Sequence, residues 1–205
     1  MNDETTRSRL ILAARDVFAE RGVDAGSVRE ITARAGANLG AVTYHFGSKD
    51  ALYEAVVDVV FAGVVTRVRA AHASAAGRPP LERIEAALRA LFAAIRDNPD
   101  FPIVVLSQAA LKHRAPAAAL QQVPAMFALL ASTIREGQAD GTIRTGDAQL
   151  MAISLLSQPA YFGIVSQLLL PRLPGVAGPH ASWEEISEHA AGFARAALAA
   201  GKEQS

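Results

Sequence analysis

The sequence predicts an all-α protein with two parts, a small helical domain over residues 1–50 and a larger helical domain over residues 51–205. Three observations carry this prediction. Hydrophobic residues make up 51% of the chain and aromatic residues only 6%, a composition typical of alanine-rich helical proteins. Apolar residues recur at three- and four-residue spacing in successive segments, as they do on one face of a helix. Glycine and proline mark the breaks between these segments.

The first predicted helix begins at Thr5 or Thr6, either of which can cap it, and ends near Arg21. Gly22 follows and stops it. The apolar face of this helix packs in our prediction against the next two helices, and it consists of Leu10, Ile11, Ala14, Val17 and Phe18.

Residues 27–50 are predicted to form two short helices joined by a tight turn, after which a third helix opens. The second of the short helices runs from Leu39 to about His45. The cap and stop signals are Ser27 with Glu30 as a capping box, Gly36, Asn38, Gly47, and Ser48 with Asp50. Two short helices around a glycine turn form a helix-turn-helix, the unit that lays its second helix in the DNA major groove.

Six further helices are predicted in the larger domain. The predicted ranges are 48–73, 81–96, 101–113, 117–137 with Pro124 inside, 148–171 and 183–200, and the breaks between them include 74–80, 141–146 and 173–182. Residues 148–171 contain no charged residue and are long enough to span a bilayer. Polar residues and Pro159 interrupt the segment, which favours a helix buried against the core on one side and a partner subunit on the other.

Composition sets further limits. The formal net charge is zero, and residues 1–55 hold seven Lys and Arg against eight Asp and Glu. A basic DNA-binding face therefore requires that charge be segregated, with Arg7, Arg9, Arg29, Arg34 and Lys49 on one side.

The chain has no cysteine, and its first residues lack the pattern of a signal peptide, so we expect a cytoplasmic protein. No catalytic motif or cofactor-binding loop is found, so we expect neither an enzyme nor a cofactor. Glu185 and His189 share a helix face and are interpreted as a surface pair rather than a metal site.

Residues Ala13 to Leu52 resemble the N-terminal DNA-binding domain of the TetR family of bacterial transcriptional regulators. The matching pieces are AAxxVFAExG, the Ser27 cap, ITARAG, TYHF and SKDAL. The resemblance implies a homodimeric, ligand-responsive regulator, most often a repressor, whose two recognition helices read a palindromic operator of double-stranded DNA. It also implies that dimerisation uses the last two helices and that a small-molecule effector enters the helical body. The DNA-contacting residues expected from it are Ser27, Asn38, Leu39, Gly40, Ala41, Thr43, Tyr44, His45 and Lys49.

Several alternatives stay open at this stage. Tyr44 either bonds a phosphate through its hydroxyl or packs between helices, and Leu39 either touches a base or belongs to the core. Gly40 inside a helix costs about 1 kcal/mol relative to Ala, and either close approach to DNA or tight packing accounts for it. A mainly apolar effector pocket is predicted, for which an ordinary core is the alternative, and its lining residues are Phe92, Ile95, Phe101, Leu106, Gln108, Phe127, Gln158, Tyr161 and Phe162. The competing function is a helical ligand carrier or protein-interaction module without sequence-specific DNA binding.

Overall fold

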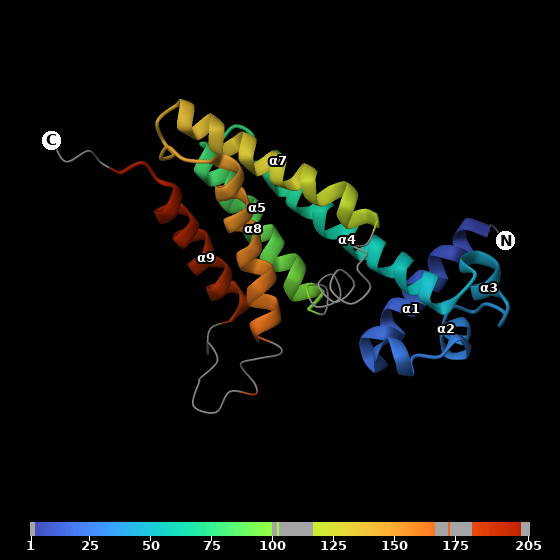
Figure 1. The fold of residues 1–205 in the computed structure, drawn as a ribbon. Helices are drawn as coiled ribbons and strands as arrows, with labels where there is room; N and C mark the ends of the chain where they lie inside the picture. Colours follow the sequence, from blue (N-terminus) through green and yellow to red (C-terminus); the bar gives the residue numbers. More distant parts are fainter. Residues whose placement is uncertain (1–2, 100–101, 103–116, 167–171, 173–181, 202–205) are drawn as a thin grey trace. The chain divides into compact units, whose positions relative to one another are not determined.

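The computed structural model describes residues 3–99, 102, 117–166, 172 and 182–201. Helices dominate the described chain, which confirms the all-α class (Figure 1). The β structure found among these residues is one isolated antiparallel bridge between Ile143 and Ala199. Contacts divide the chain into two compact units, Met1–Val60 and Phe61–Ser205. We call them the head and the body.

The head contains α1 (Asp3–Ala25), α2 (Val28–Arg34), α3 (Ala41–Phe46) and the first part of α4 (Lys49–Ser74). Its core joins the predicted apolar face of α1 to residues of the other three helices. The most deeply buried large side chains in it are Leu10, Val17, Ile31, Val42 and Leu52. Phe18 meets Tyr53 of α4 edge-on, with ring centroids 5.6 Å apart.

The first helix corrects one prediction. α1 begins at Asp3, so Thr5 and Thr6 lie inside its first turns and do not cap it. Gly22 does interrupt the helix, with φ 77° and ψ 164°, a conformation that costs a residue without a Cβ little. The chain nevertheless resumes a helical turn after Gly22 and continues to Ala25.

α4 is continuous across the division between head and body, which falls between Val60 and Phe61. Ser48 begins it, since its hydroxyl accepts the Ala51 N–H at 3.1 Å. The predicted domain boundary after residue 50 lies in the first turn of this helix. The chain has no break there, and the boundary stays a prediction.

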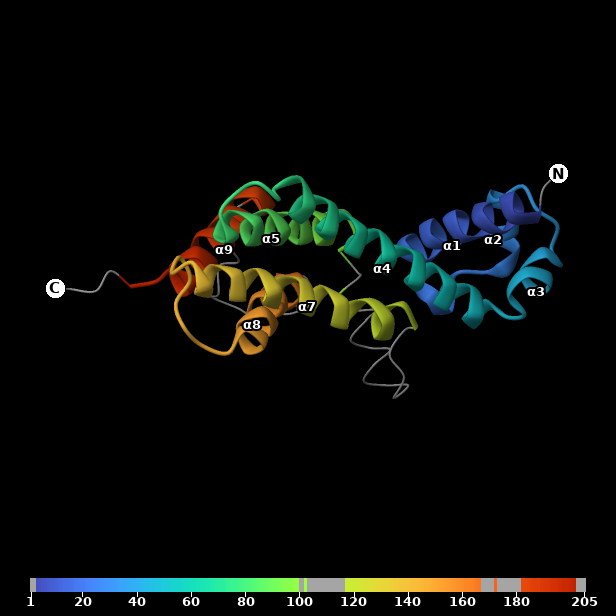
Figure 2. The ribbon, with the colours of Figure 1, turned by 90° about the horizontal axis from the view of Figure 1, so that it is seen from above.

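The body contains the rest of α4 together with α5 (Pro80–Asp97), α7 (Ala117–Ala139), α8 (Ala148–Ile164) and α9 (Trp183–Leu198). α5 packs against α7, α8 and α9, and α7 packs against α8, as Figure 2 shows from above. Ser182 opens α9 with a complete capping box, in which the Glu185 carboxylate accepts the Ser182 N–H at 2.7 Å. The predicted helix 101–113 and most of the predicted loop 173–182 lie outside the described residues.

Close packing fixes α8 against α5. A Cβ on Gly163 would lie 2.9 Å from Ile95 Cγ2, closer than side-chain carbons approach, so only glycine fits this crossing without movement. Pro124 and Pro159 both lie inside helices, α7 and α8, which continue past them. Among the described residues, no helix is sufficiently long and apolar to cross a membrane.

One polar contact is buried inside the body. His72 of α4 and Thr133 of α7 are both buried, and His72 Nε2 lies 2.8 Å from Thr133 Oγ1. The Thr133 hydroxyl donates its only proton to the Leu129 carbonyl oxygen at 3.0 Å. The neutral His72 ring must therefore donate from Nε2 to Thr133. Burial, and secondly the positive charge of Arg83, hold the pKa of His72 below its usual 6.5, against a smaller opposing effect of Glu136.

We expect this histidine to make the body less stable in acid. Below pH 6.5 the unfolded chain binds a proton at His72 more readily than the folded chain does, so the free energy of unfolding falls as the pH falls towards the lowered folded pKa. His72→Gln should flatten the loss of melting temperature between pH 7.5 and 5, whereas a variant of the exposed His189, His189→Gln, should follow wild type. Equal pH dependence in His72→Gln and wild type would contradict the assignment.

Candidate nucleic-acid interface

Ser27 positions α2, as predicted. Its hydroxyl accepts the Glu30 N–H at 3.1 Å, and Ser27 itself has extended backbone angles. The Glu30 carboxylate pairs instead with Arg21, with Oε1 3.0 Å from Arg21 Nε, so of the predicted capping box the structure gives only the Ser27 half. α2 buries Ile31 and Thr32 against the head core, and the Thr32 hydroxyl is satisfied by the Val28 carbonyl at 2.9 Å. The predicted start of the helix-turn-helix is therefore correct.

The turn between α2 and α3 differs from its prediction. Gly36 has φ +60° as expected of a residue that ends a helix. α3, however, begins at Ala41 with Gly40 as N-cap, so Asn38 does not cap it and Leu39 lies in the turn. The Asn38 carbonyl, rather than its side chain, receives the Ala41 N–H at 3.1 Å. The Asn38 amide is thereby left to face outward.

One face of α3 is buried in the head and the opposite face is exposed. Ala41 and Val42 are buried in the head core, whereas Thr43 is exposed and Tyr44 is 77% exposed. Packing of Tyr44 between helices is thus excluded. Leu39 is 62% exposed, so it does not belong to the core. A surface that presents a leucine and a tyrosine to solvent beside a hydroxyl is one that a partner can bind.

Packing inside the head does not explain why residue 40 is glycine. It has φ −76°, and a Cβ there would meet only Asn38 Oδ1, at an ordinary 3.6 Å. Tight packing is therefore not the explanation for this residue. Nor does the predicted cost of glycine inside a helix apply, since Gly40 is the N-cap, a position where glycine is favoured over alanine.

Lys49 has a structural role that the sequence did not predict. Its Nζ donates to the carbonyl oxygens of Gly26 at 2.9 Å and Asp24 at 3.2 Å, which connect α1 to α2. Lys49, the first residue of α4, thus holds the segment that precedes α2 in place through these hydrogen bonds. An ammonium group has three N–H donors, so one remains for an external acceptor.

Charge on the head is less segregated than a basic face requires. Arg34 binds both carboxylate oxygens of Glu20, at 2.7 and 2.9 Å. The hydrogen bonds from Arg34 lower the pKa of Glu20 and keep it ionised. Arg34 is thereby neutralised, contrary to its predicted place on the basic face. The Arg7 guanidinium lies 5.1 Å from the centroid of the Phe46 ring, a cation–π distance.

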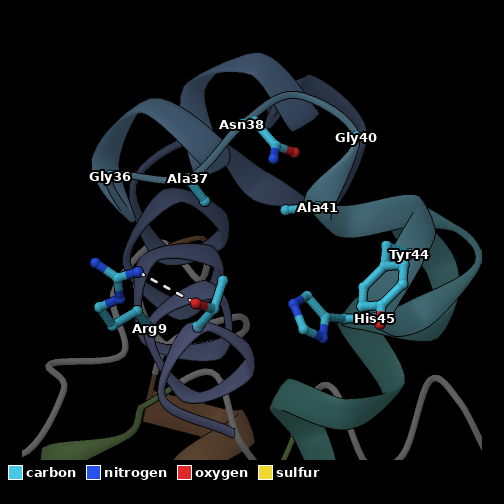
Figure 3. A pocket seen from close by; sticks show the side chains of 9 residues that line it. Arg9, Gly36, Ala37, Asn38, Gly40, Ala41, Tyr44 and His45 are labelled. Atoms are coloured by element: carbon cyan, nitrogen blue, oxygen red, sulfur yellow. Dashed lines mark hydrogen bonds between the residues drawn. The ribbon is translucent and has the colours of Figure 1, made fainter. Parts of the chain in front are cut away.

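A hollow of about 630 Å³ lies beside α3 (Figure 3). α1 forms one wall with Thr6 and Arg9, and α3 forms the other with Tyr44 and His45. The α2–α3 turn closes it above, where the small residues Gly36, Ala37, Gly40 and Ala41 adjoin the amide of Asn38. The half-buried His45 ring packs edge-on against Tyr44, with centroids 5.0 Å apart. Five of the predicted DNA-binding residues line this hollow, namely Asn38, Gly40, Ala41, Tyr44 and His45.

The predicted effector residues differ in how deeply their side chains are buried. Phe92 and Ile95 are fully buried, and the ring of the half-buried Phe162 meets Phe92 edge-on at 6.3 Å. Phe127 and Gln158 are half-buried. Tyr161 is 65% exposed, so it does not line an internal pocket. Phe101, Leu106 and Gln108 lie outside the described residues.

Tyr161 belongs instead to the exposed side of α8, and α9 exposes one large apolar side chain of its own. Leu150 and Ile153 precede it at helical spacing and are 63% and 46% exposed, and Phe193 of α9 is 55% exposed. The opposite face of α8 is buried in the body core through Met151, Ala152, Leu155 and Leu156. α8 therefore carries large apolar side chains on the side that the body covers and also on its exposed side, where Ser154 and Ser157 lie among them.

Comparisons with known proteins agree with this geometry. Residues 10–56 match the family model described as bacterial regulatory proteins, tetR family. An HTH-type transcriptional repressor of Mycobacterium tuberculosis is 49% identical over 55 residues, which cover 27% of this chain and 29% of that protein. The HTH-type transcriptional repressor NicS of Pseudomonas putida is 29% identical over 167 residues, 78% of this chain and 76% of that protein.

The fold of the whole chain also has solved counterparts. A TetR/AcrR-family regulator from Thermobifida fusca superposes with a TM-score of 0.75 at 22% identity, covering 95% of this chain and 97% of that one. Most of the matches to curated relatives are shorter, and they span 22% to 38% of the relative's own length. Similarity in sequence is thus concentrated in the head, and similarity in fold extends over the body.

Proposed function

We propose that this chain, a member of the tetR family of bacterial regulatory proteins, is a transcriptional regulator that binds operator DNA through α3. The observation that carries the proposal is the division of this helix into a buried and an exposed face. Ala41 and Val42 fix it in the head core, while Thr43 and Tyr44 stand clear of the protein. Several relatives are named as HTH-type transcriptional repressors, which favours repression.

Different residues serve different parts of the DNA. Thr43 offers a methyl group and a hydroxyl to a base edge in the major groove, and exposed Leu39 suits the methyl group of thymine. Tyr44 offers a hydroxyl to a phosphate. Ser27, at the start of α2, and His45, near the end of α3, lie at the two ends of the helix-turn-helix. Gly40 leaves room for the duplex to approach the backbone, a reason for glycine that the protein's own packing does not supply.

Binding to a palindromic operator requires two copies of the head, and the large apolar side chains that α8 and α9 expose support a homodimer. Among the described residues of the body, the exposed large hydrophobic side chains are Leu150, Ile153, Tyr161 and Phe193. A two-fold axis would bring the same face of each copy together. The proposed dimer contact is therefore the pair α8 and α9, the last two helices.

We propose further that a mainly apolar small molecule binds in the body and weakens DNA binding. The aromatic residues Phe92, Phe127 and Phe162 and the amide of Gln158 support this proposal. No Arg or Lys occurs between residues 97 and 111 or between 145 and 171, so few charges are available for an anion. Titration of aromatic compounds with and without operator should give weaker ligand binding to the DNA-bound protein, by the same factor as the ligand weakens DNA binding. Tight binding of a polyanion would contradict the proposal.

Substitutions in the head test the DNA-binding proposal. A duplex selected by the wild-type protein from random sequence and a poly(dI-dC) control are the two probes. Thr43→Ala should reduce discrimination at one base pair per half-site, about 1–3 kcal/mol of specificity. Tyr44→Phe should weaken binding to both probes alike, with an unchanged salt slope, since the lost hydroxyl is neutral.

Lys49→Met should act differently from both. It removes hydrogen bonds to the carbonyls of Asp24 and Gly26, so we expect a lower melting temperature, and loss of one cation should reduce the salt slope by about 0.9. A wild-type chain that binds the two probes equally in a mobility-shift assay would refute the proposed function.

Assembly has its own test. Ile153→Glu and Phe193→Glu would each bury an unpaired carboxylate in the proposed dimer contact, and we expect monomers by analytical ultracentrifugation at micromolar concentration. Val59→Glu is the matched control, because Val59 is 51% exposed but lies on α4 within the head. A wild-type chain that sediments as a monomer would exclude this dimer.

A further inference from the structure

We infer that the hollow beside α3 receives one phosphate of the DNA backbone and that Arg9 of α1 binds it. This inference rests on the proposed DNA-binding function and extends the interface beyond the helix-turn-helix to a residue of the first helix. It assigns a role to a cavity and to a cation that the packing of the head does not explain.

Arg9 is held in place with its charge uncompensated. Its Nη2 donates to Thr6 Oγ1, one turn earlier on α1, at 3.3 Å. Its Nη1 is the nearest group to the space above Gly36, 3.7 Å from where a Cβ would lie. Its Nε is buried and has no hydrogen-bond partner. A guanidinium carries five N–H donors, so most of the donors of Arg9 are left for a ligand.

Arg9 differs from the two arginines at the contact between α1 and α2, and among the arginines of the head it is the one that lines the hollow. Arg34 is bound to Glu20 by two hydrogen bonds, and Arg21 is paired with Glu30. Over the part of the chain that the structure describes, no carboxylate forms an ion pair with Arg9. The head therefore pairs Arg21 and Arg34 with carboxylates at its α1–α2 contact, whereas Arg9, in the lining of the hollow, has no such partner among the described residues.

The rest of the hollow suits a group that only accepts hydrogen bonds. No Asp or Glu lines it, and its other polar side chains, those of Thr6, Asn38, Tyr44 and His45, can all donate. Figure 3 shows Arg9 on one wall and His45 on the other, with the methyl groups of Ala37 and Ala41 between them. A phosphodiester is an anion with acceptor oxygens alone, and arginine is the side chain best matched to it.

Position favours a phosphate of DNA over a free phosphate compound. Tyr44 and Asn38 belong both to the hollow and to the exposed surface around α3, so the hollow is continuous with the proposed interface. Phosphates flank a major groove that holds a recognition helix. Arg9 is the one Lys or Arg in the lining, which suits a single backbone charge better than a multiply charged metabolite.

The test compares Arg9→Gln and Arg9→Lys with a control on the same helix, Arg15→Gln, whose side chain is exposed and does not line the hollow. Dissociation constants are measured against KCl concentration on the selected duplex and on poly(dI-dC). Arg9→Gln should weaken binding to both probes by about tenfold, the loss of one hydrogen bond to a charged group, and lower the salt slope by about 0.9. Arg9→Lys should keep the slope, and Arg15→Gln should behave as wild type.

Phosphate ethylation interference locates the contact. Ethylation of one particular phosphate per half-site should weaken binding of wild type but not of Arg9→Gln. An unchanged slope in Arg9→Gln, or a lowered melting temperature with an unchanged slope, would overturn the inference, because Arg9 would then be idle or only structural. Stabilisation of wild type but not of Arg9→Gln by millimolar inorganic phosphate, with equal DNA slopes, would also overturn it and assign the hollow to a free anion.

Failure of the proposed function would look different. A wild-type chain without sequence preference would bind the selected duplex and poly(dI-dC) equally. The slope difference between wild type and Arg9→Gln on poly(dI-dC) would still measure the phosphate contact.

Discussion

The head depends on burial of the apolar face of α1. The helices α2 and α3 have seven and six residues, and helices so short are not stable by themselves in water. Ile31 of α2, Val42 of α3 and Leu52 of α4 reach a common core with Leu10 and Val17 of α1. This burial fixes the orientation of α3, and through it the side chains that face outward. Every functional statement about Thr43 and Tyr44 rests on the opposite face of the same helix.

Local signals in the sequence predicted most helix ends correctly, and contacts between distant residues account for what they missed. Ser27, Gly36, Gly47 and Ser48 each act within a few residues of their own position, so their chemistry is legible from the chain alone. Asn38 was misassigned because the turn brings its carbonyl, not its side chain, to Ala41. Lys49 binds carbonyls 23 and 25 residues earlier, a contact no local pattern encodes. Tyr161 was misplaced because α8 carries large apolar side chains on two sides, and sequence does not tell which one the body covers.

The proposed binding of DNA by a chain of zero net charge would depend on cations that the head leaves without carboxylate partners. Pairing of Arg34 with Glu20 and of Arg21 with Glu30 removes charge from parts of the surface that hold the head together. The proposed interface with DNA holds a small number of cations set among hydroxyl and amide groups. Such an interface would depend less on salt than a broad basic patch does, because fewer counterions would be released per complex. Specificity would then come from shape and from a few side chains on α3.

Gly40 differs from the other glycines of the helix-turn-helix. Gly36 and Gly47 have positive φ, so the fold itself selects glycine at both positions. Gly40 has helical angles and open space around it, so the fold does not require glycine there. A side chain could stand at this position without disturbing the head. Any requirement for glycine would therefore come from what approaches α3 from outside, and not from the need to fold.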